Sequence, residues 1–298
     1  MNLRKVLVTG ANGQLGYELQ HTVAAGVELI ATDYQTLDIT NAAHIAAALE
    51  QYQPDLVINA AAYTAVDKAE SDQANAQRLN GDAAGLIAQA VAQANSHKPT
   101  QLVHISTDFV FDGSSSLPYA TDATPAPLGV YGATKLSGEQ QVQQYLPAAL
   151  IIRTSWLYST HGANFVKSML RFMQEREQLG VVYDQVGSPT WARTLATTIW
   201  ALAAKDASGI LHCSDNGVAS WYDFAVTIQE EAYRLGMLNK RIPINPIRSR
   251  AYPTPAQRPA FSVMDKSRTE EQLEYRLPYW RDSLQAMLQE LNQSTHKA

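Results

Sequence analysis

The stretch GVYGATKLSGE, at positions 129–139, holds the residues whose types and spacing are most suggestive of chemistry. Its tyrosine and lysine, Tyr131 and Lys135, are four positions apart, so they share one face of a helix. A free phenol has a pKa near ~10, which is too high for efficient proton transfer at neutral pH. An ammonium about 4 Å away supplies up to roughly 4 kcal/mol at an effective dielectric of ~20, enough to bring that pKa toward ~7. The pair predicts a tyrosine general acid whose pKa is lowered by the lysine.

Polar residues at the end of a predicted strand extend this candidate catalytic group. The apolar run 101–107 is followed directly by Asp108, so Ser106, Thr107 and Asp108 reach one edge of the sheet. We expect Thr107 to hydrogen-bond a substrate carbonyl while Tyr131 protonates its oxygen. Such a set suits the reduction of a ketone by hydride from a nicotinamide. A tyrosine–lysine pair alone is usually an exposed pair on a helix, so this interpretation depends on the neighbouring motifs.

A glycine motif supplies the cofactor half of the hypothesis. The segment TGANGQLG, at 9–16, places Gly10, Gly13 and Gly16 in the spacing G-x-x-G-x-x-G. It follows the first predicted strand and opens the first predicted helix, which is the context of a dinucleotide fingerprint. Glycines permit a tight turn and close backbone approach, so a pyrophosphate can bind the free N–H groups at the helix N-terminus. An ordinary glycine turn is the alternative.

Residues after the next two predicted strands indicate how a dinucleotide would lie. Asp33 follows Gly10 by 23 positions, where a carboxylate can bind ribose hydroxyls and repel a 2′-phosphate. This favours NADH over NADPH; a simple turn at the strand end is the alternative role. We expect Asp38 and Ile39 near an adenine pocket. The small residues of NAAAYTAVD, at 59–67, leave room for a flat ligand across the sheet edge.

Strand-like and helix-like segments alternate through the first half of the chain. The strand-like segments are continuous apolar runs, which indicates burial on both faces, as in a parallel sheet covered by helices. This alternation is typical of an α/β fold with a doubly wound parallel sheet of the Rossmann type. The predicted strands are 5–10, 27–33, 55–62, 101–107 and 149–158, and the predicted helices include a stretch ending near residue 24, 41–52, 74–94 and the segment that carries Tyr131.

The second half has a looser pattern and predicts a smaller C-terminal substrate-binding domain. We assign residues 1–158 to a dinucleotide-binding domain, with segments at about 190–215 returning to it, and most of 159–298 to the second domain. Prolines crowd 243–259, which predicts mostly irregular structure there. The polar loop 112–129 is longer than most connections, so we expect it to be functional or mobile. Further elements are expected as helices 164–177, 190–205, 221–236 and 279–292 and as strands 180–184 and 209–215.

Composition limits the classes of protein that fit. The net charge of −5 argues against a general nucleic-acid binder. The single cysteine, Cys213, excludes an intrachain disulfide and fits a reducing compartment. The apolar run in the first ten residues is too short for a signal peptide, and no stretch approaches the ~18 apolar residues that span a bilayer. We therefore expect a cytoplasmic protein that binds neither nucleic acid nor membrane.

The motifs together resemble the extended short-chain dehydrogenase/reductase superfamily and, within it, the dTDP-4-dehydrorhamnose reductase family. The resemblance covers most of the chain in order, through TGANGQLG, NAAAYTAVDKAE, STDFVFDG, VYGATKLSGE, RTSWLY, DQVGSPT and YPTPAQRP. It implies that Thr107, Tyr131 and Lys135 are catalytic. It also implies that Asp108 and Trp156 lie near the sugar nucleotide. The cofactor-binding residues implied by the glycine motif and the resemblance are Gly10, Gly13, Gln14, Leu15, Gly16, Asp33, Asp38, Ile39, Ala62, Tyr63, Thr64, Ile105, Tyr131 and Lys135.

The resemblance implies a reaction and raises a question about metal. The implied reaction is hydride transfer from NADH or NADPH to C4 of dTDP-6-deoxy-L-lyxo-4-hexulose, which gives dTDP-L-rhamnose for polysaccharide biosynthesis. Some family members bind magnesium through glutamates at a dimer interface. Glu18 matches one of those positions, but Arg193 stands at another, and an arginine cannot ligate a hard cation. A magnesium-bridged dimer is therefore doubtful, while a homodimer as such is left open.

Rival functions within the same fold remain open from the sequence. A 4,6-dehydratase of the superfamily needs an acid after Asp108, where Phe109 stands, so dehydration is disfavoured. A nucleotide-sugar epimerase needs the same catalytic set but keeps NAD bound through each cycle. A non-catalytic subunit resembling the regulatory subunit of methionine adenosyltransferase keeps the fold without the reaction; the complete catalytic set argues against it.

One basic stretch has two interpretations. Residues 239–264 contain five cationic side chains and no acid, which suits either a cradle for a substrate diphosphate or a solvated basic face. The five residues are Lys240, Arg241, Arg248, Arg250 and Arg258.

Overall fold

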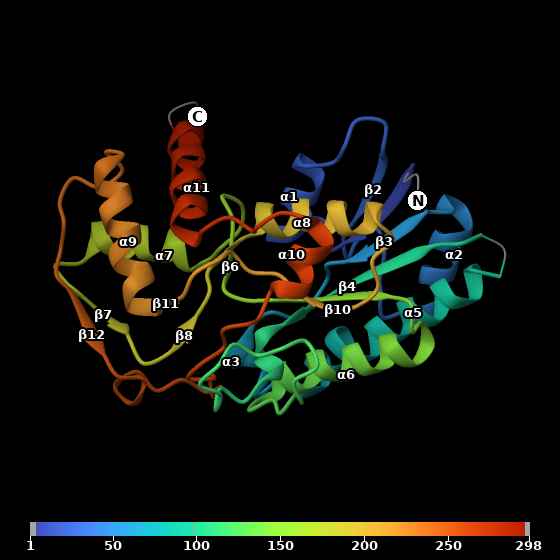
Figure 1. The fold of residues 1–298 in the computed structure, drawn as a ribbon, viewed down its shortest axis with the longest axis horizontal. Helices are drawn as coiled ribbons and strands as arrows, with labels where there is room; N and C mark the ends of the chain where they lie inside the picture. Colours follow the sequence, from blue (N-terminus) through green and yellow to red (C-terminus); the bar gives the residue numbers. More distant parts are fainter. Residues whose placement is uncertain (1–3, 97, 296–298) are drawn as a thin grey trace.

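The computed structural model describes residues 4–96 and 98–295 and builds a central sheet of six parallel strands (Figure 1). The strand order is β10-β5-β4-β3-β1-β2, so successive strands are added on one side of β1 and then on the other. This order confirms the predicted doubly wound α/β fold. The six strands are β1 Lys5–Thr9, β2 Glu28–Thr32, β3 Leu56–Asn59, β4 Gln101–Thr107, β5 Leu150–Thr154 and β10 Gly209–His212.

Helices cover both faces of the sheet, with α1 and α8 on one face and α5 and α6 on the other (Figure 1). Alternate strand residues are apolar on both faces: Val6 and Val8 of β1 pack into the main core on one face of the sheet, while Leu7 packs into the main core on the other face. None of the helices within the described ranges is long and apolar enough to cross a membrane. The α-helices are α1 Gln14–His21, α2 Ala42–Tyr52, α3 Val66–Ala69, α4 Gln73–Ala76, α5 Ala83–Ala94, α6 Val130–Tyr145, α7 Phe165–Glu175, α8 Ala192–Ala204, α9 Trp221–Arg234, α10 Ser267–Leu273 and α11 Trp280–Thr295.

Short irregular helices interrupt this pattern. A π-helical segment, Gln77–Asp82, joins α4 to α5, so the predicted helix 74–94 is one helical region with a local change of pitch. Short 3₁₀ turns follow β4, at Asp108–Val110, and the strand β12 (Ile244–Ile247), at Ser249–Ala251. The first three residues of the stretch considered for a signal peptide lie outside the described residues.

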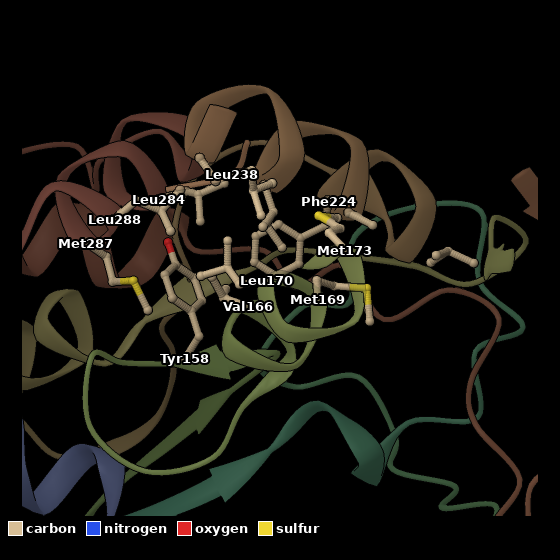
Figure 2. Close-up of a cluster of buried hydrophobic side chains, with 14 of the residues drawn as sticks. Tyr158, Val166, Met169, Leu170, Met173, Phe224, Leu238, Leu284, Met287 and Leu288 are labelled. Atoms are coloured by element: carbon tan, nitrogen blue, oxygen red, sulfur yellow. The ribbon is translucent and has the colours of Figure 1, made fainter. Parts of the chain in front are cut away.

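A second core lies beside the sheet and is built by α7, α9 and α11 (Figure 1). Figure 2 shows the ring of Tyr158 reaching into this core toward Leu284 and Met287, with Phe224 farther along the same cluster. Three two-stranded ladders border it and pair β6 with β9, β7 with β12, and β8 with β11. These short strands are β6 Leu157–Tyr158, β7 Leu179–Val182, β8 Val186–Gly187, β9 Thr190–Trp191, β11 Ala219–Ser220 and β12 Ile244–Ile247.

The predicted strand 149–158 is wrong as a single element. The central strand ends at Thr154, and Leu157–Tyr158 forms a separate strand that pairs with β9 outside the sheet. Between them Trp156 has a φ of 46°, a left-handed backbone conformation that a continuous strand cannot contain. The break turns the chain away from the sheet and toward the second core.

The prediction of mostly irregular structure for 243–259 missed one strand. Ile244–Ile247 forms β12, which pairs in parallel with β7 although it contains Pro246. A ladder of two strands leaves one edge of each unpaired, which is where a proline without an N–H is tolerated. Helix α10, Ser267–Leu273, was also missed because its seven residues are too few for a helical period to stand out.

Candidate active site

A cavity of about 1110 Å³ opens at the carboxyl edge of the central sheet. Ligands of doubly wound sheets bind at this edge, beside the point where the winding changes direction. Its lining includes the loop after β1, the small residues after β3, the ends of β4 and β5, and the first turns of α6. The cavity brings together most of the predicted residues: Gly10, Gly13, Gln14, Leu15, Asp33, Ile39, Ala62, Thr64, Ile105, Thr107, Asp108, Tyr131, Lys135 and Trp156.

The glycine loop forms the end of the cavity suited to phosphate. Gly10 has a φ of +70°, and a Cβ there would lie 2.7 Å from the backbone nitrogen of Ala61, so only glycine fits. Gly16 lies beneath the loop rather than in the lining, and a Cβ on it would stand 2.3 Å from the Gly10 carbonyl oxygen. Helix α1 begins at Gln14 without a side-chain cap, so its first N–H groups are available to an anion.

Asp33 stands next to the glycine loop, and its carboxylate is already held in place. It accepts hydrogen bonds from the Asn12 amide at 2.6 Å and from the backbone nitrogens of Gln35 and Thr36 at 3.0 and 3.1 Å. Partial desolvation acts to raise its pKa, but these hydrogen bonds prevail and hold the pKa below its usual value. The Asp33 carboxylate is therefore held in one orientation, in a part of the cavity lining that also includes Leu37.

Two predicted cofactor residues point elsewhere. Asp38 does not line the cavity, because its carboxylate accepts hydrogen bonds from the backbone and hydroxyl of Thr40 at 2.9 and 2.7 Å. Tyr63 also lies outside the lining, and its hydroxyl donates to Asp72 at 3.0 Å. The backbone of Tyr63 is clasped by the side chain of Asn80, which accepts from its nitrogen at 2.8 Å and donates to its oxygen at 3.1 Å. The structure thus gives both residues a role in shaping the adjacent loops.

Helix α6 presents Tyr131 and Lys135 to the cavity from one face. The Lys135 ammonium donates to the Ile105 carbonyl oxygen at 2.5 Å, which ties the helix to β4. Tyr131 shares the cavity lining with Thr107, and its ring stands edge-on to Phe109, with centroids 5.5 Å apart and planes at 78°. The three predicted catalytic side chains therefore converge on one part of the cavity.

The predicted lowering of the tyrosine pKa is wrong for this structure. Burial raises the pKa of Tyr131 to about 12, and the nearby Asp108 carboxylate adds to the rise, while the hydrogen bond with Thr107 opposes it. Burial also lowers the pKa of Lys135 to about 8. The ammonium is directed at the Ile105 carbonyl, so desolvation of the phenol outweighs its electrostatic effect on Tyr131.

Asp108 is a buried acid next to this group. Its Oδ1 accepts a hydrogen bond from Thr107 at 3.1 Å, whereas Oδ2 has no hydrogen-bond partner within the described part of the chain. Burial raises the pKa of Asp108 to about 6, although hydrogen bonds oppose the rise. An unpartnered carboxylate oxygen at a cavity wall suits a ligand hydroxyl.

Trp156 lines the cavity at the point where the chain leaves the sheet. Its indole stacks on Trp221 of α9, with ring centroids 3.5 Å apart and planes at 4°. The strained φ of 46° at Trp156 and this stack together fix a flat aromatic wall. The resemblance assigned Trp156 to the sugar nucleotide, and the structure places it in the cavity lining that also contains Thr107 and Asp108.

The structure adds residues that sequence reasoning did not select as site residues. The hydroxyls of Ser106 and Thr154 are buried, line the cavity and have no hydrogen-bond partner among the residues described. Thr154 ends β5 as Thr107 ends β4, and the two are paired in register, so the strand-end rule that selected Thr107 also points to it. The lining residues 162–164, in contrast, come from a short connection with no motif.

The glutamate considered for magnesium is paired within the chain. The guanidinium of Arg193 bonds Glu18 at 2.8 Å through Nε and Glu290 at 2.8 Å through a terminal nitrogen. Glu18 is fully buried, so this arginine neutralises a carboxylate that has no access to solvent. A cationic side chain thus stands between the two acids, and these residues do not fit a divalent cation.

The basic stretch 239–264 does not form one cradle. Lys240 pairs with Glu177 at 2.8 Å, Arg241 approaches Glu230 at 3.7 Å, and Arg258 pairs with Asp67 at 2.8 Å. None of the five basic residues is in the cavity lining, and three are neutralised by carboxylates on different elements.

Comparison with known proteins identifies the family. The family model described as RmlD substrate binding domain matches residues 4–293. A dTDP-4-dehydrorhamnose reductase from Escherichia coli (strain K12) is 41% identical, covering 97% of this chain and 99% of the relative. A crystal structure of the Bacillus anthracis str. Ames reductase in complex with NADP superposes with a TM-score of 0.90 at 35% identity, covering 97% and 99% of the two chains. An orthologue from Clostridium acetobutylicum ATCC 824 gives a TM-score of 0.89 at 38% identity, covering 96% and 99%. The chain therefore belongs to the dTDP-4-dehydrorhamnose reductase family.

Proposed function

We propose that this protein is an NAD(P)H-dependent oxidoreductase that reduces the C4 ketone of dTDP-6-deoxy-L-lyxo-4-hexulose and yields dTDP-L-rhamnose. The observation that carries the proposal is the meeting of Tyr131, Thr107 and Lys135 in the cavity that also contains the glycine loop. Membership in the reductase family, with identities up to 41% over nearly the whole chain, supports the same reaction.

The lining fits a nicotinamide dinucleotide along its length. The glycine loop leaves space that a Cβ would fill, and the uncapped start of α1 suits a diphosphate. Asp33 suits the hydroxyls of a ribose, and the unpartnered hydroxyls of Ser106 and Thr154 suit the polar groups at the other end. When bound, the cofactor supplies a hydride. A relative was crystallised with NADP, and preference for NADH remains a prediction that rests on the Asp33 carboxylate.

The chain's own residues then have distinct tasks. With a pKa of about 12, Tyr131 is protonated at neutral pH and can donate its proton to the ketone oxygen of the sugar. Thr107 hydrogen-bonds the same oxygen and orients the phenol. Lys135, with a pKa of about 8, remains an ammonium at neutral pH and supports the developing negative charge. We assign the cofactor side of this site to Gly10, Gly13, Gln14, Leu15, Ile39, Ala62, Thr64 and Ile105, all of which are in the lining.

The sugar nucleotide is assigned to the other side of the cavity. We place Asp108 and Trp156 against it, because one offers a free carboxylate oxygen and the other a flat aromatic face. The main core on both faces of the sheet and the second core support the predicted division, with residues 1–158 and the segments near 190–215 holding the dinucleotide and most of 159–298 holding the sugar nucleotide. Tyr158 and Trp191 are exceptions, because they pack in the second core. We place the reaction in the cytoplasm, and association as a homodimer stays a prediction.

The test is a reductase assay with the C3,C5-epimerised dTDP-4-ketosugar. We expect oxidation of NADH or NADPH to follow substrate, and Tyr131→Phe to lower kcat by about 10²- to 10⁴-fold because it removes the general acid. NADH binding should survive in the phenylalanine variant, measured by fluorescence titration. Activity that persists in this variant would mean that another group donates the proton.

Two further outcomes would favour the rival functions. Purified protein that carries stoichiometric NAD and exchanges it slowly would favour an epimerase, since a reductase must exchange its cofactor in each turnover. Intact NADH binding without turnover of the ketosugar would favour a non-catalytic subunit.

A further inference from the structure

The connection between β6 and α7, residues 159–164, has the sequence STHGAN and touches the candidate cofactor site. Its last three residues line the cavity together with Gly13 and Gln14 of the glycine loop. Gly162 has a φ of +73°, which lets the chain turn tightly beside Gln14; a Cβ there would come within 3.3 Å of the Gln14 side chain. We call residues 159–164 the strap.

The middle and the end of the strap are bonded to the glycine loop. The Nε2 atom of His161 is 3.0 Å from the carbonyl oxygen of Asn12, to which it donates when Nε2 carries the proton. The amide of Asn164 donates to the side-chain oxygen of Gln14 at 3.0 Å. The imidazole of His161 also stacks on Tyr17, with centroids 4.6 Å apart and planes at 4°. Three contacts therefore join the strap to the segment that would carry a diphosphate.

The start of the strap is anchored more firmly. The hydroxyl of Ser159 donates to Glu18 at 2.8 Å, and both residues are fully buried. Glu18 is in turn paired with Arg193. The strap thus has one fixed end, whereas the contacts made by His161 lie near solvent and are individually weak.

We infer that the strap covers the diphosphate of bound NAD(P)H and slows its departure, with His161 and Asn164 as positioning residues that act through the glycine loop. The inference rests on the proposed function and assigns it a residue set outside the dinucleotide motif. A reductase must release the oxidised cofactor before each new cycle, so the strap must detach from Asn12 and Gln14 at every turnover. Its contacts then set part of the rate of cofactor exchange.

The experiment measures NADH dissociation directly, without sugar substrate. Protein loaded with NADH is mixed with excess NAD⁺ in a stopped-flow instrument, and the loss of NADH fluorescence gives the dissociation rate. The variants are His161→Ala and Asn164→Ser. Serine keeps the cap that Asn164 provides to the Lys167 nitrogen at 3.1 Å, but it lacks the amide that donates to Gln14 at 3.0 Å and to the Ser159 carbonyl oxygen, within the strap, at 2.7 Å.

His21→Ala is the matched control. His21 lies on α1 and its ring centroid is 3.9 Å from that of Tyr17, yet it makes no hydrogen bond to the glycine loop. We expect His161→Ala and Asn164→Ser each to accelerate NADH dissociation about five- to tenfold, the effect of losing one hydrogen bond to the glycine loop, with the control near the wild-type rate. The KM for the ketosugar and the thermal midpoint should be unchanged, which separates this effect from general damage.

Three results would overturn the inference. Dissociation within about twofold of the wild type in both variants would overturn it alone and leave the proposed function standing. Equal acceleration in the His21→Ala control would assign the effect to loosening of α1. Failure of the wild-type protein to bind NADH or NADPH would overturn the proposed function and this inference together.

Discussion

At the scale of single residues, the buried carboxyl group of Asp108 lowers the stability of the folded protein. The side chain is buried, and one of its oxygens has no hydrogen-bond partner within the described part of the chain. Ionisation of this group is unfavourable in the protein without substrate, because the hydrogen bonds that the carboxylate accepts do not make up for the water lost on burial. The same oxygen is available to a hydroxyl of the sugar, so the arrangement that weakens the fold suits the proposed substrate.

Asp108→Asn is therefore expected to stabilise the empty protein at neutral pH. The pKa rises from 3.8 to about 6 on folding, so ionisation costs the folded state nothing below pH 3.8 and its full penalty above pH 6, at most roughly 3 kcal/mol. Thermal denaturation at pH 5 and pH 7.5 checks the sign: the gain of the variant over the wild type should be larger at pH 7.5. An equal gain at both pH values would contradict this account.

The titration of Lys135 predicts how kcat/KM falls at alkaline pH. Burial lowers the pKa of its ammonium to about 8, so the charge is present at neutral pH and is lost as the pH rises through that value. We expect kcat/KM to fall above pH 8 in the wild type, because this parameter reports groups of the free enzyme. In Lys135→Arg the overall rate should drop, but the decline should disappear from this range since a guanidinium does not titrate there. A limb that is unchanged in the arginine variant would belong to another group.

At the scale of elements, helix α6 is held at its start and near its middle. Its first N–H, on Val130, donates to Glu70 at 2.9 Å, which replaces the missing side-chain cap at Gly129. Farther along, Glu139 accepts two hydrogen bonds from Arg153 of β5, at 2.9 and 2.7 Å, and both side chains are buried. These contacts fix the orientation from which Tyr131 meets the cavity.

Glu70→Ala is expected to lower kcat several-fold and to cost about 0.5–2 kcal/mol of stability. The substitution removes the side-chain hydrogen bond to the first N–H of α6, and Tyr131 is the next residue of that helix. Glu70→Gln keeps an acceptor of the same reach and should restore most of kcat. Steady-state kinetics and thermal denaturation of both variants separate the two effects. Equal loss in the alanine and glutamine variants would show that the charge of Glu70, rather than its hydrogen bond, matters.

The elements differ in how far the sequence alone could place them. All six strands of the central sheet were predictable, although the predicted strand 149–158 extended past the end of β5, because a strand buried on both faces leaves a direct composition signal. The split after Thr154 was not, because it depends on a positive φ at Trp156 that a stack with Trp221 supports. Strand β12 was not predicted for two reasons. Its proline argues against a strand, and its pairing partner β7 is more than sixty residues away in the chain.

The candidate site shows the same division. Residues in motifs, such as Gly10 and Tyr131, were found from spacing, and the cavity gathers them. The prediction of a lowered tyrosine pKa failed for a physical reason. The spacing places the Lys135 ammonium on the same helix face as Tyr131, but it does not reveal that the ammonium donates its hydrogen bond to the Ile105 carbonyl oxygen. The strap was missed because its small polar residues look like an ordinary linker until the fold brings them to the glycine loop.

At the scale of the whole molecule, Arg193 joins three distant parts of the chain. It connects Glu18 of α1 to Glu290 of α11 from its own position on α8. Because Glu18 is fully buried, loss of the arginine leaves an unpaired charge in the interior. The ion network therefore couples the sheet-covering helices to the C-terminal helix.

Arg193→Ala should destabilise the protein by about 2–4 kcal/mol, somewhat less than a fully buried pair because the arginine is partly exposed. The double variant Glu18→Gln, Arg193→Met removes both charges and should recover part of the loss. Urea denaturation of the two variants provides the comparison. A double variant as unstable as the single one would mean that packing, rather than the unpaired carboxylate, is responsible.

The same network predicts that divalent metal ions affect neither the activity nor the stability of the protein. Since the Arg193 guanidinium already stands between Glu18 and Glu290 and bonds both, we expect neither EDTA nor added Mg²⁺ to change activity or the thermal midpoint. The control is Arg193→Glu, which restores a third carboxylate at this place and should make the thermal midpoint depend on Mg²⁺. A wild-type protein that loses activity in EDTA would contradict the assignment.

The parallel indoles of Trp156 and Trp221 give the molecule an optical reporter. One belongs to the turn leaving the sheet and the other to α9, with ring centroids 3.5 Å apart. Rings this close perturb each other's emission, and one of them faces the cavity. Tryptophan fluorescence should therefore register both the arrival of a sugar nucleotide and any change in the spacing of the two halves, without a label.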